Sequence, residues 1–258
     1  MGSIFKYCLF DLMRSKWAIT YTLFYFVSCS ALLYFSNSPS NAVASLMNIV
    51  LFITPLVSLL LGIIYFYQNR DFAELLLSQP IKRNAYFLGN YLGLSTSLVL
   101  SLLVGFGIPC IVFGTYELIE ELGVLILSGV MLTLVFSGMA LLLTLYNENR
   151  IKGFGYAILA WLFFAVIYDG LFLVALFWFN DYPLEKFALA ATILNPMDLS
   201  RVMILLQLDL SALLGFTGAS FRHFFGSYTG FFVSLGSIML WIFVPLWALL
   251  KKGNSKDF

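Results

Sequence analysis

Residues 122–146 read LGVLILSGVMLTLVFSGMALLLTLY, a run of 25 residues without one charged side chain. A helix that crosses a bilayer needs about 20 mainly apolar residues, and this run is longer than that. Lipid offers the backbone no hydrogen-bond partners, so a segment inside it must pair its own N–H and C=O groups as a helix. The run therefore predicts a transmembrane helix.

The same pattern recurs in five other stretches, each bounded by polar or charged residues. They are Trp17–Phe35, Leu46–Tyr67, Tyr86–Phe113, Phe154–Phe179 and Tyr228–Leu250. Gly105, Gly107 and Pro109 indicate a kink or break near the far end of the third span. We therefore predict an all-α, polytopic membrane protein with six transmembrane helices.

The composition supports a lipid environment and excludes several function classes. Apolar residues make up 61% of the chain and charged residues 10%, with a mean hydropathy of +0.95. Soluble domains carry about 25% charged residues, so water alone cannot solvate this surface. The net charge of +1 gives no reason to expect a nucleic-acid partner.

The distribution of basic residues predicts the orientation of the chain. With the N-terminus in the cytoplasm, six spans return the C-terminus there, and only three basic residues lie outside: Lys186, Arg201 and Arg222. The eleven others lie inside: Lys6, Arg14, Lys16, Arg70, Lys82, Arg83, Arg150, Lys152, Lys251, Lys252 and Lys256. The positive-inside rule therefore predicts a cytoplasmic-membrane protein with both termini in the cytoplasm.

The N-terminal segment, residues 1–16, precedes the first span and has an amphipathic pattern. Its apolar residues follow helical spacing over Ile4–Lys16: Phe5, Cys8, Leu9, Leu12 and Met13. A basic amphipathic helix in this position favours the cytoplasmic membrane interface. A frayed, lipid-touching tail is the alternative.

The cytoplasmic loop 68–84 contains a short apolar helix. The stretch Arg70–Gln79 has helical character, Phe72, Leu75 and Leu76 share one face, and Pro80 ends it. A leucine-rich face in the cytoplasm requires a partner, or else the helix folds back onto the bilayer surface.

The outer segment 180–226 is too long for a simple connection. Two apolar pieces, Leu184–Leu194 and Leu199–Leu214, are separated by Asn195-Pro196, and Asp198 is placed to cap the second piece. We expect two extracytoplasmic helices that lie against the membrane face. They either dock a partner or close the outer end of the bundle.

Asp169 is the one acid that falls clearly inside a predicted span. A central charge of this kind costs about 2.5–3.5 kcal/mol on insertion scales, so it needs a compensating contact. A structural role, in which Asp169 holds neighbouring helices or the outer segment together, is favoured over an ion, cargo or gating site.

The chain shows no catalytic motif. GxxxxGK[ST], HExxH and GxSxG are all absent, so we predict no ATPase site, no catalytic residue and no cofactor of its own. The cysteines Cys8, Cys29 and Cys110 are too scattered for a metal or disulfide pattern and are interpreted as packing residues. Copper ligation by His223 with Met197 and Met203 is a weaker alternative to packing.

The loop carries a family resemblance. Residues 74–83, ELLLSQPIKR, followed by residues 87–93, FLGNYLG, resemble the LLLS-x-P…LGK-x-x-G signature of ABC-2 type transporter permeases. Asn90 stands where that family usually has Lys. The N-terminal helix and the six-span layout also look like the family. The resemblance thus implies a single transmembrane domain over residues 1–258.

A second passage is similar to the NosY-like subfamily, which serves the maturation of the copper enzyme nitrous oxide reductase. It consists of Asp169 and residues 194–201, LNPMDLSR. That subfamily has an Asp in the fifth span before an outer Asn-Pro-x-Asp-x-x-x-Arg pattern. Here two residues, rather than three, separate Asp198 from Arg201.

The resemblance implies a homodimer of permeases on two copies of a separate, NosF-like ATPase that binds ATP and Mg²⁺. Residues 1–16 would be the elbow helix and residues 68–84 the coupling loop. The ATPase-coupling residues it implies are Phe72, Glu74, Leu75, Leu76, Leu77 and Pro80. The residues implied to contact a periplasmic, NosD-like partner are Asn195, Pro196, Asp198 and Arg201.

Two other functions fit the same features. An ABC-2 exporter permease for a lipid, peptide, drug or ion would respond to its substrate with increased ATPase activity. An ATP-independent scaffold or carrier would be insensitive to an Asp at Leu75 or Leu76. The ABC interpretation predicts that such a charge abolishes docking to the ATPase, because it would enter an apolar groove.

Overall fold

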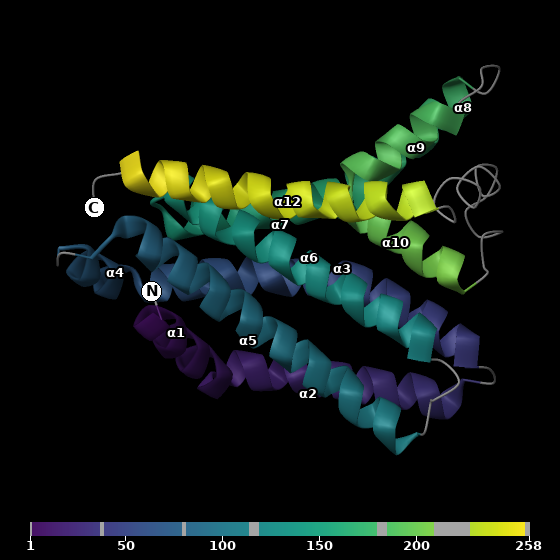
Figure 1. Cartoon of the computed structure of the whole chain (residues 1–258), viewed down its shortest axis with the longest axis horizontal. Helices are drawn as coiled ribbons and strands as arrows, with labels where there is room; N and C mark the ends of the chain where they lie inside the picture. Colours follow the sequence, from purple (N-terminus) through teal and green to yellow (C-terminus); the bar gives the residue numbers. More distant parts are fainter. Residues whose placement is uncertain are drawn as a thin grey trace.

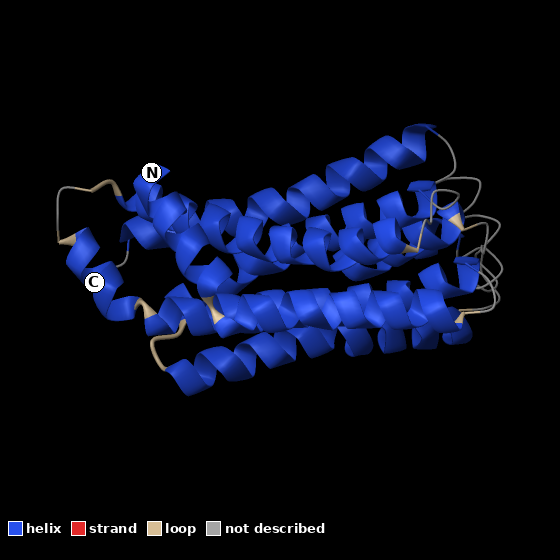
Figure 2. Cartoon of the chain, turned by 90° about the horizontal axis from the view of Figure 1, so that it is seen from below, coloured by secondary structure: helices blue, strands red, loops and turns tan. Residues whose placement is uncertain are grey.

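Six helices in the described part of the chain are long and apolar enough to cross a membrane. The computed structural model describes residues 2–36, 39–78, 81–113, 119–179, 185–208 and 228–255. Every regular element within these ranges is a helix, and the long ones lie side by side (Figures 1 and 2). The predicted all-α, six-span class is confirmed.

The observed spans agree with the predicted ones to within a few residues at most ends. They are α2 (Lys16–Phe35), α3 (Pro39–Gln68), α5 (Arg83–Val112), α6 (Ile119–Tyr146), the α7–α8 unit described below, and α12 (Tyr228–Ser255). The largest difference is the start of α3, at Pro39 rather than Leu46. Proline is favoured in the first turn of a helix, where its missing N–H costs nothing.

Of the kink or break predicted in the third span, the break does not occur, since α5 is one continuous helix; the kink stays a prediction. Pro109 lies in its last turn, where the one hydrogen bond it removes, its own to the carbonyl oxygen of residue 105, is at the end of the helix. Gly105 serves packing: an added Cβ would lie 2.7 Å from the Cβ of Tyr25 on α2. The glycine therefore permits close approach of two helices.

The fifth span contains the irregularity that the sequence did not reveal. It consists of α7 (Arg150–Leu162), the π-helix η2 (Phe163–Ile167) and α8 (Tyr168–Trp178). In Figure 1, α8 and its neighbour α9 lean away from the other spans. A π-turn inside an α-helix is rare and is frequently found at functional sites.

The centre of the bundle is formed by α3 and α6, which pack closely along their length. A Cβ added to Gly62 on α3 would lie 2.6 Å from the Cβ of Ala140 on α6, so no larger residue fits there. The buried hydroxyls of Tyr25 and Thr54 are hydrogen-bonded at 2.7 Å between α2 and α3. Small residues and one polar contact thus fix the central helices, as is usual in membranes.

The two helices after the fifth span are α9 (Glu185–Leu194) and α10 (Pro196–Gln207), bent by 113° at Asn195. They do not lie along the membrane face as expected. The Asn195 side chain bonds to Phe164 O in the middle of the fifth span, and Ser237 Oγ of α12 bonds to Ile193 O. The turn at Asn195 and helix α10 therefore lie within the bundle, whereas α9 leans out with α8. Residues 209–227 lie outside the described ranges.

Helix α1 (Gly2–Arg14), the short helix α4 (Arg70–Leu77) and the C-terminal end of α12 lie at the same end of the bundle (Figure 1). We call this the inner end and the opposite end the outer end. An even number of spans requires both termini on one side, and the structure meets that requirement.

Candidate functional site

Helix α4 presents two large apolar side chains to solvent at the inner end. Phe72 is 39% exposed and Leu75 is 66% exposed. Ala73 is buried, and Leu76 and Leu77 are partly buried against the core. The predicted coupling face is thus divided: Phe72 and Leu75 are available to a partner, whereas Leu76 and Leu77 hold the helix to the bundle.

The position of α4 is fixed by contacts to the turn between α6 and α7. Arg70 pairs through Nε with Glu74 Oε1 at 3.1 Å and donates from Nη1 to the carbonyl oxygen of Glu148 at 3.3 Å. The Tyr67 hydroxyl, at the end of α3, donates to the carbonyl oxygen of Asn147. An exposed ion pair within one helix stabilises by only about 0.3–0.5 kcal/mol. The pair with Glu74 therefore mainly orients the Arg70 side chain toward the turn.

Helix α1 lies beside α4 and shares a cavity with it. The rings of Tyr7 and Phe72 are 5.2 Å apart. A cavity of about 270 Å³ lies between these helices and the inner ends of α3 and α5, and its wall includes Tyr65, Leu76 and Asn90. Helices α1 and α4 therefore form adjacent walls of the same cavity.

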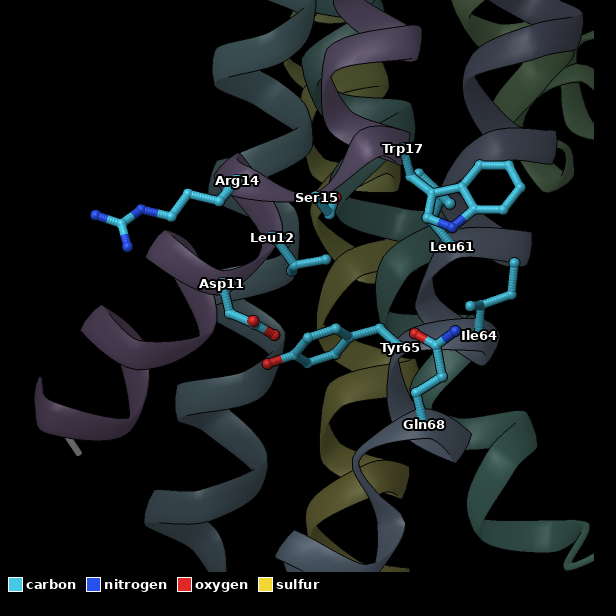
Figure 3. A pocket seen from close by; sticks show the side chains of 9 residues that line it. All are labelled: Asp11, Leu12, Arg14, Ser15, Trp17, Leu61, Ile64, Tyr65 and Gln68. Atoms are coloured by element: carbon cyan, nitrogen blue, oxygen red, sulfur yellow. The ribbon is translucent and has the colours of Figure 1, made fainter.

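A second cavity, of about 260 Å³, lies where α1 turns into α2 against α3. Figure 3 shows that Asp11 of α1 points toward Tyr65 and Gln68 of α3, whereas Arg14 points away from the cavity. Helix α1 is thus packed onto the bundle, with Cys8 and Leu12 buried. The alternative of a frayed tail does not describe residues 2–14.

Two residues of the FLGNYLG stretch receive α1. A Cβ added to Gly93 would lie 2.6 Å from both Cβ and Sγ of Cys8, so the helices touch only because this residue is glycine. The Cys8 thiol donates to the carbonyl oxygen of Asn90 at 3.6 Å, and Asn90 itself is buried. This part of the family signature therefore docks the N-terminal helix on α5.

At the outer half of the bundle, the predicted polar residues meet in one network. Arg201 Nη1 lies 2.7 Å from Asp169 Oδ2 and 3.2 Å from Asp198 Oδ1. Asn195 Nδ2 donates to Asp198 Oδ2 at 2.9 Å. The ion pair between Asp169 and Arg201 joins α8 to α10. This placement fits the structural role favoured for Asp169.

The network contains two carboxylates against one guanidinium. The Arg201 and Asp169 side chains are 26% and 28% exposed, and that of Asp198 is 12% exposed. Charges with so little water depend on each other and on nearby dipoles for compensation. Arg201 therefore supplies the positive charge that compensates both Asp169 and Asp198.

Asn195, rather than the predicted Asp198, caps α10. Its Oδ1 accepts from Met197 N at 3.0 Å, and its Nδ2 donates to Phe164 O at 3.0 Å. In η2, Tyr168 N–H bonds to Phe163 O, five residues back, instead of to Phe164 O as in an α-helix. The Asn195 amide thus satisfies a carbonyl that the π-helix releases.

The residues predicted to contact a periplasmic partner lie mostly inside the protein. Asn195 and Pro196 are buried, and Asp198 is 9% exposed as a whole residue. In this arrangement only Arg201 keeps appreciable access to solvent. The partner contact itself stays a prediction, as does the role of the α4 residues. Pro80, predicted to end α4, lies outside the described residues.

The copper-ligand alternative stays untested by the structure. His223 lies outside the described ranges, and Met197 is buried within α10. Within those ranges, no group of three or more His, Cys, Asp or Glu residues is placed to hold a metal ion.

Two cysteines that the sequence separates by 81 positions come together. The Cys29 side chain on α2 lies beside that of Cys110 on α5. Cys29 is buried and Cys110 is partly exposed. No spacing within the sequence could reveal this contact, because it depends on how α2 and α5 align.

Comparison with known proteins gives two relatives that cover most of the chain; no family model matches it. A Pseudomonas aeruginosa protein, "Probable ABC transporter permease protein NosY", is 25% identical over 260 residues, covering 93% of this chain and 90% of the relative. The protein of the same name from Stutzerimonas stutzeri is 29% identical over 217 residues, covering 76% and 77%.

These similarities agree with the six apolar helices and with the loop that resembled a permease signature. They support the role of an ABC transporter permease, a multi-pass membrane subunit that is not itself catalytic. The resemblance inferred from the sequence is confirmed: over most of its length, this chain is similar to ABC transporter permeases of the NosY kind.

Proposed function

We propose that this chain is the transmembrane subunit of an ABC complex in which a separate ATPase drives an extracytoplasmic partner during maturation of nitrous oxide reductase. The ATPase, NosF-like, would bind ATP and Mg²⁺ at the inner end. The partner, NosD-like, would bind at the outer end. The complex would lie in a bacterial cytoplasmic membrane with both termini in the cytoplasm.

The observation that carries the proposal is the exposed pair Phe72 and Leu75 on a helix otherwise held to the bundle. Exposure of two large apolar side chains to water is unfavourable unless a partner covers them. A groove on an ATPase would cover them, and the stabilisation would be about 1.5–3 kcal/mol for each fully buried side chain. We therefore assign Leu75 as the centre of the ATPase contact.

A continuous route leads from α4 to the outer network. Arg70 contacts the turn at Glu148, and α7 begins at Arg150. The fifth span then runs through η2 to Asp169, which is paired with Arg201 on α10. A helix transmits axial displacement, so force on α4 would reach α10 through this span. The irregular turn η2 lies on this route.

A homodimer is consistent with the outer part of the fifth span. Helix α8 has no buried residue, and Leu171, Leu173 and Phe177 are 60%, 63% and 81% exposed. A second copy would cover part of this surface and lipid the rest. Two permeases would then present two α4 helices to two ATPase subunits.

The test is a docking experiment with Leu75→Asp in the full-length protein. We expect the ATPase to be lost from the permease on purification from membranes, while the fold of the permease is retained. Leu75→Met, which conserves volume and apolarity, is the matched control and should keep the ATPase bound.

The other outcomes are also informative. Retention of the ATPase by Leu75→Asp would contradict the assignment of α4, and absence of any ATPase with the wild type would favour a scaffold or carrier. Co-purification of a right-handed β-helix periplasmic protein would support the maturation role. ATPase stimulation by a hydrophobic substrate would support an exporter instead.

A further inference from the structure

Helices α2 and α5 run in the same direction, from the inner to the outer end, and are packed unusually closely. The rings of Tyr25 and Phe106 are 5.0 Å apart. A Cβ added to Gly105 would lie 2.7 Å from Tyr25 Cβ and 3.0 Å from the carbonyl oxygen of Thr22. The two helices are therefore so close here that no residue larger than glycine fits at position 105.

One turn beyond this contact lie two thiols. Cys29 follows Tyr25 by four residues, and Cys110 follows Phe106 by four residues, so each lies on the same face as the residue before it. Because the helices are parallel, the two positions face each other, and the side chains are in contact. A disulfide requires Cα atoms about 4.4–6.8 Å apart, which only closely packed helices provide.

The surroundings of the two thiols differ. Cys110 is partly exposed and stands two residues before the outer end of α5 at Val112. Cys29 is fully buried on α2. A reagent arriving from the outer side therefore meets Cys110 first, and Cys29 can react only with Cys110. Cys8 is at the other end of the bundle, bonded to Asn90.

We propose that Cys29 and Cys110 are a redox-active dithiol that closes to a disulfide between α2 and α5 by exchange with a disulfide substrate from the outer side. The Cys110 thiolate attacks the substrate disulfide and forms a mixed disulfide, releasing one thiolate. The Cys29 thiol then loses its proton and attacks Cys110 Sγ, releasing the second thiolate. The protein loses two protons and two electrons, and the substrate disulfide becomes two thiols.

The disulfide would bind the first span to the third near their outer ends. Any conformational cycle that slides or separates these helices would stop in the oxidised form and resume on reduction. The extracytoplasmic space is the oxidising side of a bacterial membrane, so the pair is placed where a disulfide substrate is available. The inference needs the outward placement of this end but not the identity of the ATPase or of its partner.

The experiment treats spheroplasts that contain the full-length protein with oxidised glutathione, which does not cross the membrane. Free thiols are then blocked in denaturant with N-ethylmaleimide. Remaining disulfides are reduced, and the released thiols are counted by the gel shift of a polyethylene-glycol maleimide. Variants to alanine keep Cβ and remove only the sulfur, so packing at each position is changed little.

The expected counts distinguish Cys110, which attacks the substrate disulfide, from Cys29, which resolves the mixed disulfide. The wild type and Cys8→Ala should each release two thiols, within a monomer. Cys29→Ala should release one, from the trapped mixed disulfide at Cys110, and Cys110→Ala should release none. No released thiol in the wild type, two in Cys110→Ala, or closure only with oxidant on the inner side would overturn the proposal.

Discussion

Replacing Arg201 by methionine should destabilise the outer half of the bundle. The guanidinium is the one cation in contact with Asp169, at 2.7 Å, and with Asp198, at 3.2 Å, among the described residues. Methionine fills a similar volume but leaves two neighbouring acidic side chains without a cation. Removing one partner of a fully buried pair costs about 3–5 kcal/mol. With about a quarter of both the Arg201 and the Asp169 side chain exposed, solvent screening lowers the expected loss to about 2–3 kcal/mol.

The matched variant is Asp169→Asn. It leaves Arg201 and Asp198 as a neutral pair, and asparagine can still accept a hydrogen bond from Arg201. We therefore expect a loss of less than about 1 kcal/mol. The double variant Asp169→Asn with Arg201→Met keeps one uncompensated carboxylate, so its stability should lie above that of Arg201→Met alone.

Unfolding by SDS titration in lipid nanodiscs, followed by tryptophan fluorescence, measures the loss of stability in each of the three variants. The indole of Trp161 on α7 donates to Phe52 O on α3, so its emission reports the packing of the fifth span. The predicted order of destabilisation is Arg201→Met, then the double variant, then Asp169→Asn. Equal losses for Arg201→Met and Asp169→Asn would refute the charge argument.

Two further changes test the docking of α1 and the cap of α10. Gly93→Val should push α1 from α5, because its Cβ would meet Cys8 at 2.6 Å, and should expose the N-terminus to protease; Gly107→Val, with no atom within 4 Å of its Cβ, should not. Asn195→Ala should lower the free energy of unfolding by about 2–3 kcal/mol, from about 1 for the lost cap and 1–2 for the unpaired Phe164 carbonyl, as measured by the same SDS titration. An unchanged midpoint of unfolding would show that Asn195 does not stabilise the turn between α9 and α10.

The long spans could be predicted because their signal is local. A run such as residues 122–146 must be helical in lipid whatever its neighbours are, and charges mark where it ends. The N-terminal helix and α4 were found for a similar reason, since their apolar spacing is helical. The predicted break at Gly105 and Pro109 was wrong, because a glycine that permits close packing and a glycine that permits bending look alike in sequence.

The missed features depend on contacts between distant segments. The π-helix Phe163–Ile167 has neither Gly nor Pro, and it is supported by Asn195, 31 residues beyond Phe164. The depth of the α9–α10 pair and the contact of Cys29 with Cys110 likewise follow from packing. Asp169 and Arg201 could be singled out by their charge, but their pairing required the fold of the segment between them.

The most direct test of the central claim is photo-crosslinking from position 75 of α4. A photoreactive amino acid in place of Leu75, activated in intact cells, should yield an adduct between the permease and a cytoplasmic nucleotide-binding protein. The same group in place of Leu171 on α8 should yield none. Labelling of position 75 from outside the cell, or equal adducts from both positions, would contradict the account.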